Sequence, residues 1–334
     1  MVTTEQIVRR CRDAGAVAAG VVECAPVDEE DWRLFTEWRA EGKHAGMSYM
    51  EKYDEVRRDP RLLLEGVRTM IVCAFDYRHP SAGNRLIAEY ARGRDYHITV
   101  RERLQPVCDW LEEGWGGATR ICVDSAPLRE RYWAVRAGLG WTGRNGQLVV
   151  PSIGSAVNLA AILWTGQPTS FVPQPSTFNP QPSSLNPQPS SFDFRPSTFD
   201  SLHSPLSTLH SPCDTCRKCV DACPGHALDG TGRVDARRCL SYLTIESKDP
   251  LPEGTRLCGQ MFGCDICRLV CPYNINVESA QDPAVIDPPS VTDLTAEDWQ
   301  TLPSNQLKRI IKNTPLTRVP ISRLRYLASQ INPK

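Results

Sequence analysis

Apolar positions follow two alternating patterns through the first 166 residues of the chain. Apolar runs of strand length stand at 69–75, 119–123 and 156–164, and longer stretches with helical or amphipathic character stand at 5–22 and 98–114. Short apolar runs indicate strands, whereas apolar residues that recur every three or four positions indicate helices. Strands that alternate with helices predict an α/β domain over residues 1–166.

The pattern stops at residue 167, where proline, serine and glutamine dominate. Gln167, Gln174, Gln181 and Gln188 recur every seven residues, but ten prolines lie between positions 168 and 212. Proline lacks the backbone donor that a helix needs, which excludes a helical coiled coil. We therefore expect a disordered, tandemly repeated linker over 167–212. The alternative is a proline-rich docking motif, although most repeats lack the flanking basic residue of such ligands.

Two shorter regions follow the linker. Residues 213–289 are rich in cysteine, and residues 290–334 predict a short helical tail. From position 301 onward the tail contains no acidic residue and seven basic ones: Lys308, Arg309, Lys312, Arg318, Arg323, Arg325 and Lys334. This asymmetry makes the tail a candidate phosphate-binding surface. A solvated helix face that binds nothing is the alternative.

Length and composition are typical of a globular protein. The chain has 334 residues, of which 41% are hydrophobic, and a formal net charge of −1, so its overall charge does not favour polyanions. No stretch approaches about 18 consecutive apolar residues, which predicts no membrane span. The pair Arg9-Arg10 is followed by further charged residues instead of the apolar run of an export signal. We expect a cytoplasmic protein.

Cysteine usage points to metal binding. The chain contains 14 cysteines, and nine of them lie between positions 213 and 271. Cytoplasmic thiols are kept reduced, so disulfides are not expected. The five remaining cysteines are scattered and are interpreted as small apolar residues: Cys11, Cys24, Cys73, Cys108 and Cys122.

The segment from Cys213 to Pro224 follows the C-x2-C-x2-C-x3-C-P spacing of bacterial two-cluster ferredoxins. In that arrangement the first three cysteines bind one [4Fe–4S] cluster and the fourth binds the other. A partner motif, C-x2-C-x3-C-P, begins at Cys264 and is one cysteine short of the usual run. The spacing predicts a domain that holds two [4Fe–4S] clusters.

Two such clusters need eight thiolates. The exchange between motifs assigns four cysteines to the first cluster: Cys213, Cys216, Cys219 and Cys271. The second cluster then has three from the motifs, Cys223, Cys264 and Cys267, and a fourth that is either Cys239 or Cys258. We favour Cys239, because Cys258 stands only six residues before Cys264. Structural zinc is the alternative, but zinc ligands usually come as two CxxC-type pairs with a longer spacer.

Three further segments resemble one known family. YARGRDYH at 90–97, VDSAPLRERYWAVRAGLGWTGRNG at 123–146 and DARRCLSYLTIE at 235–246 look like epoxyqueuosine reductase of the QueG family, and they occur in family order with the ferredoxin motif. The resemblance covers about 1–166 and 213–330. It implies an α/β cobalamin-binding domain, an α+β ferredoxin-like domain with two [4Fe–4S] clusters, and a short helical C-terminal region.

The resemblance also implies a reaction, the reduction of epoxyqueuosine to queuosine at the wobble position of tRNA, and it makes Asp124 the proton donor. Asp124 follows the apolar run 121–123, where an α/β sheet usually places its chemistry, and Pro127 fits the first turn of a helix. A helix cap formed by Asp124 or Ser125 is the alternative. A proton donor must be protonated when it acts, so we expect a raised pKa for Asp124.

Cobalamin is implied by the resemblance alone. Asp95-Tyr96-His97 is followed by Ile98-Thr99-Val100, so the DxHxxG motif of histidine-ligated cobalamin is not met. We expect polar contacts to this cofactor from Arg57, His97, Asp124, Ser125 and Ser241. The expected partners are tRNA that carries epoxyqueuosine and an external low-potential electron donor, for a protein that is monomeric.

Two other functions compete with this hypothesis. A cobalamin and iron–sulfur reductase of a small molecule, similar to reductive dehalogenases, would share the electron relay but would not need the basic tail. A non-catalytic electron carrier would leave residues 1–166 without a role. Salt-dependent affinity for tRNA separates the first hypothesis from these two.

Overall fold

The computed structural model describes residues 1–78, 85–169, 213, 215–275, 277 and 290–331. Its largest element is a four-stranded sheet in the order β1-β2-β6-β3, and every neighbouring pair is antiparallel. The strands are β1 (Ala18–Glu23), β2 (Thr69–Asp76), β3 (Thr119–Cys122) and β6 (Val157–Trp164). A separate two-stranded sheet pairs β4 (Trp141–Thr142) with β5 (Leu148–Val149).

The three strands predicted at 69–75, 119–123 and 156–164 are confirmed as β2, β3 and β6. The stretch 5–22 holds more than an amphipathic segment: α1 (Thr4–Asp13) ends before Gly15, and β1 follows. Gly15 has a φ of +94°, a backbone conformation that glycine adopts readily and that turns the chain out of the helix. The helix expected at 98–114 lies within α4 (Tyr96–Trp115).

The carboxyl ends of two strands lie together at one end of the sheet, which is called the sheet edge below. β2 and β3 run in the same direction on either side of β6, with Asp76 opposite Val157 and Cys122 opposite Ala161. The carboxyl ends of β2 and β3 therefore lie on the same side of the sheet as the amino end of β6. The loop that follows β3 leaves the sheet from this edge.

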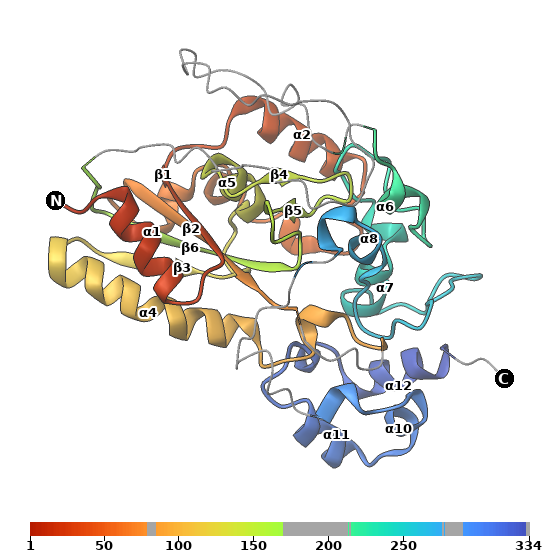
Figure 1. The fold of residues 1–334 in the computed structure, drawn as a ribbon. Coiled ribbons are helices and arrows are strands. Elements are labelled where there is room, and N and C mark those ends of the chain that lie inside the picture. The colour runs from red at the N-terminus through yellow and green to blue at the C-terminus, as the bar shows by residue number, and fades with distance from the viewer. Residues whose placement is uncertain (79–84, 170–212, 214, 276, 278–289, 332–334) are drawn as a thin grey trace.

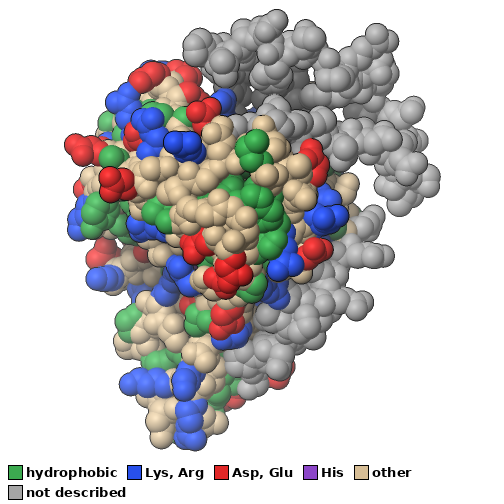
Figure 2. Space-filling model, turned by 90° about the vertical axis from the view of Figure 1, so that its left-hand side faces the viewer, with side chains coloured by type: hydrophobic (Ala, Val, Ile, Leu, Met, Phe, Trp, Pro, Cys, Tyr) green, Lys and Arg blue, Asp and Glu red, His purple; other side chains and the backbone are tan. Residues whose placement is uncertain are grey.

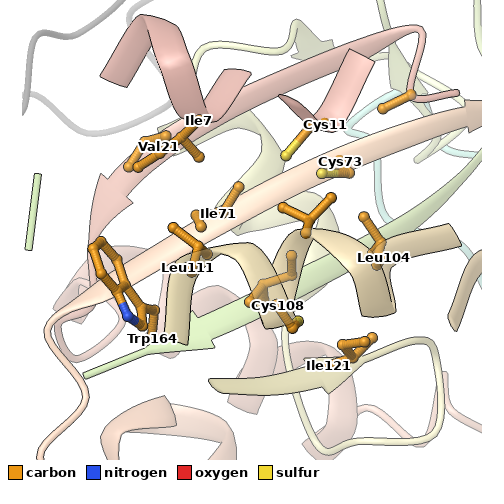
Figure 3. Packing of buried hydrophobic residues seen from close by; sticks show 14 of the residues in the cluster. Ile7, Cys11, Val21, Ile71, Cys73, Leu104, Cys108, Leu111, Ile121 and Trp164 are labelled. Carbon is orange, nitrogen blue, oxygen red and sulfur yellow. The ribbon is translucent and has the colours of Figure 1, made fainter. Parts of the chain in front are cut away.

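Helices cover both faces of the four-stranded sheet (Figure 1). On one face, α1 and α4 pack on alternate strand residues, and Figure 3 shows Ile7 and Cys11 of α1 facing Ile71 and Cys73 of β2. Cys11, Cys73 and Cys108 are buried in this apolar core, as expected for small apolar residues. On the other face, α5 (Glu130–Arg136) buries Trp133 against a second core.

Short helices carry the cysteine-rich segment, which docks on the α/β part of the chain. They are α6 (Lys218–Asp221), η4 (Ala236–Arg238), α7 (Leu240–Ile245), α8 (Ile266–Leu269) and η5 (Pro272–Asn274). The backbone N–H of Met261 donates to Leu86 (2.6 Å), and that of Ala88 donates to Phe262 (2.8 Å). The indole of Trp38, in α2 (Glu29–Ala40), donates to Val234 (2.7 Å).

The C-terminal region is helical, as predicted. It comprises η6 (Ser290–Thr292), α10 (Ala296–Thr301), α11 (Ser304–Ile310), η7 (Pro315–Arg318) and α12 (Ile321–Ser329). Its apolar residues share a third core with Leu86 and Ile87 of the α/β part and with Phe262 of the cysteine-rich part. Among the described residues, no helix is long and apolar enough to cross a membrane.

Of the predicted linker 167–212, only the first three residues lie within the described part of the chain. Residues 278–289, at the end of the predicted cysteine-rich domain, lie outside it as well. The boundaries at 166, 212 and 289 therefore stay predictions.

Candidate functional site

The first predicted ligand group brings residues from both motifs together. Burial raises the pKa of Cys219, and the nearby thiols of Cys213, Cys271 and Cys216 add to the increase. Burial likewise raises the pKa of Cys271, which lies in the electrostatic range of Cys213 and Cys216. Cys271 thus lies with the three cysteines of the earlier motif, as the exchange between motifs requires.

The second predicted ligand group also forms one cluster of thiols. Burial raises the pKa of Cys264 to about 12 and that of Cys267 to about 12, and the thiols of Cys239 and Cys223 add to both increases. Cys258 is exposed, and its thiol donates a hydrogen bond to the carbonyl of Arg256 (3.5 Å). This grouping supports Cys239 as the eighth ligand.

Backbone N–H groups are directed at the sulfurs. Cys239 and Cys271 are the N-cap residues of α7 and η5, where the first turn of a helix leaves N–H groups without helical partners. The N–H groups of Tyr242 and Ser241 are directed at Cys239, and that of Ala227 donates to Cys223 Sγ (3.3 Å). Such donors stabilise thiolates and tune the potential of an iron–sulfur cluster.

No group of three or more His, Cys, Asp or Glu side chains in the described part of the chain is arranged to hold a single metal ion. The fit to iron–sulfur clusters rests instead on how the eight thiols divide into two groups of four. The thiol of Cys219 in the first group also contributes to the raised pKa of Cys267 in the second, so the two groups are neighbours. Electron transfer between two clusters needs this proximity.

Asp124 lies in the loop between β3 and α5, at the sheet edge where β2 and β3 end. The helix expected to begin near Pro127 begins at Glu130, because residues 124–129 form a loop. The N-cap of α5 is Arg129, and it makes no side-chain cap hydrogen bond. Asp124 and Ser125 are therefore not helix caps, and the structure does not support that alternative.

The carboxylate of Asp124 is surrounded by donors. Its Oδ2 accepts a hydrogen bond from the hydroxyl of Tyr96 (2.7 Å) and lies 3.3 Å from Nε2 of His97. The guanidinium of Arg318, from η7, is 3.5 Å from the same oxygen. The side chain of Asp124 remains 47% exposed, so it is still accessible from outside the protein.

The expectation of a raised pKa for Asp124 is wrong for this arrangement. Burial acts to raise the pKa, but the hydrogen bonds from His97 and Tyr96 and the charge of Arg318 outweigh it and hold the pKa of Asp124 well below its usual range. Donors that bond the charged form of a carboxyl stabilise that form. Asp124 is therefore a carboxylate here.

His97 links this carboxylate to a second one. Its Nδ1 lies 2.7 Å from Oδ1 of Asp95, which is also the N-cap of α4. Its Nε2 faces both Asp124, an acceptor, and Arg318 (2.5 Å), a donor. Burial acts to lower the pKa of His97, but the hydrogen bonds to Asp124 and Asp95 outweigh it and raise that pKa. Contact with the two carboxylates thus favours the protonated form of His97, next to the Asp124 carboxylate.

Arg57 and Tyr49 lie on a further side of this site. Arg57, in α3 (Asp54–Arg58), is buried, donates to the carbonyl of Tyr49 (3.1 Å), and has a buried Nε that bonds to no partner among the described residues. The side chain of Tyr49 is 45% exposed. Partial burial raises the pKa of Tyr49 to about 12, and the charges of Glu246 and Asp124 add to the increase. The charges of both Arg57 and Asp124 act on Tyr49, so Tyr49 lies near both residues.

The two serines predicted to contact cobalamin lie on different elements. Ser125 follows Asp124 and is exposed. Ser241 lies in the first turn of α7, where its backbone N–H is directed at Cys239. Ser241 is therefore placed at the second cysteine group.

Three residues of the site were not identified from the sequence. Tyr96 lies within a segment that carried the family resemblance, but its contact with Asp124 spans 28 positions. Glu130 follows Asp124 by six positions and accepts the hydrogen bond of its backbone N–H (2.7 Å). Arg318 was counted among the basic residues of the tail, and nothing in the local sequence signals that it faces Asp124.

The comparisons with known proteins agree with this geometry. A family model described as a 4Fe-4S double cluster binding domain matches residues 212–274, and one described as epoxyqueuosine reductase QueG matches residues 57–125. An epoxyqueuosine reductase of Synechococcus sp. (strain CC9605) is 32% identical over 330 residues, which cover 95% of this chain and 90% of the relative. One of Cyclobacterium marinum is 32% identical over 326 residues, which cover 94% and 92%.

A solved structure shows the same fold. The crystal structure of epoxyqueuosine reductase with a tRNA-Tyr epoxyqueuosine-modified tRNA stem loop matches with a TM-score of 0.78 at 23% identity, over 98% of this chain and 80% of that one. The sequence relatives carry the assignment further, because their identity extends over almost the whole of both chains. The chain belongs to the epoxyqueuosine reductase family.

Proposed function

We propose that this protein reduces epoxyqueuosine to queuosine at the wobble position of tRNA, the final step of queuosine biosynthesis. The observation that carries the proposal is the similarity to epoxyqueuosine reductases over 95% of the chain. The two groups of cysteines and the Asp124 site support it, because an electron relay and a proton-handling site are what this reduction needs.

The chemistry sets the requirements. Removal of the epoxide oxygen breaks two C–O bonds and forms a C=C bond, and it consumes two electrons and two protons while the oxygen leaves as water. The clusters pass electrons singly, so a group that collects two is needed between them and the substrate. A bound cobalamin would supply this low-potential reducing chemistry, while the protein supplies orientation and protons.

The residues at the site fit a cofactor with polar groups. Arg57 has a buried Nε without a partner among the described residues, and Asp124 and Ser125 are exposed. The charges of Arg57 and Asp124 both act on Tyr49, which lies near both residues. We assign cobalamin contacts to Arg57, His97, Asp124, Ser125 and Ser241. Ser241 also stands beside Cys239, at the second cysteine group. The cluster ligands are proposed as two groups: Cys213, Cys216, Cys219 and Cys271, and Cys223, Cys239, Cys264 and Cys267.

Asp124 is proposed to transfer the proton to the departing oxygen. The lowered pKa of Asp124 and the raised pKa of His97 keep the proton off Asp124 at rest, so the proton passes from His97, 3.3 Å away, through Asp124 only as the departing oxygen takes it up. Asp95 holds the other nitrogen of His97 and stabilises the imidazolium. A half-exposed carboxylate with a cationic neighbour can be reprotonated after each turnover.

We propose that the C-terminal region contributes phosphate contacts to tRNA. Lys308, Arg309 and Lys312 are exposed on and beside α11. Figure 2 shows basic side chains gathered at the lower end of the molecule, where Figure 1 places the C-terminal helices, whereas both signs are mixed elsewhere on that face. Arg323 and Arg325 instead donate to the carbonyls of Leu243 and Leu302.

The small-molecule reductase and the electron carrier are not favoured, because the relatives that extend over the whole chain are epoxyqueuosine reductases. Catalysis needs an external low-potential electron donor. We further propose that the protein acts as a monomer in the cytoplasm, the compartment in which its tRNA substrate is found.

The test is conversion of a defined substrate. A tRNA stem loop that carries epoxyqueuosine is incubated without oxygen with the cluster-loaded chain, cobalamin and a strong reductant, and its nucleosides are weighed by mass spectrometry. The expected result is loss of one oxygen mass and formation of queuosine, only when cobalamin is present. Unchanged epoxyqueuosine with verified clusters and bound cobalamin would reject the proposal, and turnover of an organohalide in the same mixture would favour the small-molecule reductase.

A further inference from the structure

The loop that carries Asp124 has an unusual backbone conformation. Asp124 has a φ of +51°, in the left-handed region that residues with a side chain seldom adopt. Aspartate tolerates this region better than most residues, but the conformation still needs support from its surroundings. Residues 124–129 belong to no helix or strand, so the sheet and α5 do not supply that support through regular hydrogen bonds.

The side chain of Glu130 supplies this support to the Asp124 backbone. Glu130, the first residue of α5, turns back so that its Oε1 accepts the hydrogen bond of the Asp124 N–H (2.7 Å). This bond closes the loop from the α5 side. The side chain of Asp124 is held from elsewhere, by Tyr96 and His97 of α4 and by Arg318 of η7. Since α4 and α5 cover opposite faces of the sheet, the backbone and the side chain of Asp124 are held from opposite sides (Figure 1).

We propose that Glu130 is a positioning residue that holds the Asp124 loop in the conformation that presents its carboxylate to His97 and Tyr96. This deepens the proposed function, since it concerns how the proton-transferring group of that reaction is kept in place. Without the bond from Glu130, the left-handed backbone at Asp124 loses its closest support, and the carboxylate moves away from His97.

The charges around Glu130 suit this role. Burial and the negative charge of Asp124 raise the pKa of Glu130 to about 8, whereas the Asp124 N–H, Arg131 and His97 oppose the increase. With its raised pKa, Glu130 stays uncharged to a higher pH than an ordinary glutamate does, and in that form it holds the loop without repelling the Asp124 carboxylate. A neutral carboxyl still accepts a hydrogen bond through its carbonyl oxygen. Glutamine is then a close match in charge, shape and acceptor capacity.

The competing explanation for Glu130 is that an acidic residue in the first turn stabilises α5 through the helix dipole. It predicts that any loss of Glu130 weakens the helix without a specific effect on His97. The two explanations therefore differ in what happens to the protonation of His97, whose pKa is raised by its hydrogen bonds to Asp124 and Asp95 and lowered by burial and Arg318.

The experiment follows the titration of His97 by NMR in the full, cluster-loaded chain with labelled histidine, and His97→Asn identifies its signal among the six histidines. We expect Glu130→Ala to lower the pKa of His97 to the value found in Asp124→Asn. Glu130→Gln is expected to leave it at the wild-type value. Adding Glu130→Ala to Asp124→Asn should produce no further shift, because the interaction with the Asp124 carboxylate is already lost.

Two results would overturn the proposal. One is an unchanged His97 titration in Glu130→Ala, and the other is an equal downward shift in the Asp124→Asn background, which would mean general damage to the helix. If Glu130→Ala does not retain its clusters, Glu130→Asn is measured instead, because it is neutral but one methylene too short to reach the loop. The readout needs neither cobalamin nor turnover, so it is independent of whether the protein reduces epoxyqueuosine.

Discussion

Asp124 illustrates how three donors decide the charge of one carboxyl group. Tyr96, His97 and Arg318 all face it, and together they stabilise the ionised form more than burial disfavours it. In the proposed mechanism His97 is the source of the proton, while Asp124, whose side chain is 47% exposed, is the group that faces outward. This division of roles differs from a carboxylic acid that is kept neutral by an apolar pocket.

Asp124→Asn should lower the rate of epoxyqueuosine reduction by about 10²- to 10⁴-fold, the usual contribution of a positioned acid. The clusters and their iron content should be unaffected, since Asp124 contacts no cysteine. Single-turnover kinetics checks this, with Asp109→Asn on the exposed side of α4 as the matched control. Full turnover by Asp124→Asn would remove Asp124 from the mechanism.

The raised pKa of His97 predicts a pH-dependent stability. A group whose pKa is higher in the folded state stabilises the fold fully below its unfolded value, about 6.5, and this contribution is lost as the pH rises through the folded value. The difference in Tm between wild type and His97→Asn should therefore shrink as the pH rises. Anaerobic thermal unfolding at a series of pH values measures it, with exposed His226→Asn as control. A constant difference would contradict the assignment.

At this scale the sequence predicted the acid but not its surroundings. Asp124 and His97 stand in segments that resemble the family, and the structure places them 3.3 Å apart. Arg318 is 194 positions from Asp124, and no local pattern relates the two. The charge state of Asp124 was predicted wrongly because it depends on these distant donors.

Among the elements, the short helices of the cysteine-rich part explain its motif spacing. α7 and η5 each begin directly after a cysteine, so their first N–H groups can be directed at sulfur. Helices of three to six residues, such as these, have little stability of their own. Their geometry is therefore expected to depend on the clusters that the thiols bind.

Cys239→Ser should reduce the iron content from about eight to about four atoms per chain, because one cluster loses a ligand while the other keeps all four. Cys258→Ser should keep the full content, since that thiol is exposed and separate from both groups. Iron analysis after anaerobic reconstitution compares the two. The opposite pattern would make Cys258 the eighth ligand.

The sequence predicted the more apolar strands closely but missed an element built from small residues. β2 and β6 have long apolar runs and β3 has a short one, and all three strands lie within about one residue of the prediction. β1 was missed because its small residues, Ala18 to Gly20, carry little strand signal. Pro127 suggested the start of a helix, but residues 124–129 form the loop that carries Asp124, and the helix begins at Glu130.

In the whole molecule, the C-terminal region is part of the site as well as a candidate surface for tRNA. Its η7 supplies Arg318, and Asn313 accepts the backbone N–H of Asp95 (2.6 Å). Its apolar core includes residues of the other two regions. The arrangement joins the tail, the cysteine-rich part and the Asp124 loop into one structure, which the sequence-based division into separate regions did not anticipate.

Replacing Lys308, Arg309 and Lys312 together by glutamine should weaken tRNA binding and reduce the slope of log affinity against log salt by up to about 3, roughly one for each lost phosphate contact. The control replaces exposed Arg9 and Arg12 of α1, which lie in another part of the molecule. Binding isotherms at several salt concentrations measure both. Equal slopes for wild type and the triple variant would assign tRNA binding to another surface.

The central claim is that this chain removes one oxygen atom from the wobble nucleoside of tRNA. The most direct measurement is the mass of that nucleoside in tRNA from a bacterial strain that lacks its own epoxyqueuosine reductase and expresses this protein. Queuosine should replace epoxyqueuosine with the wild-type chain, and epoxyqueuosine should persist with Asp124→Asn. Persistence of epoxyqueuosine with wild-type protein that is folded and carries its full iron content would contradict the account.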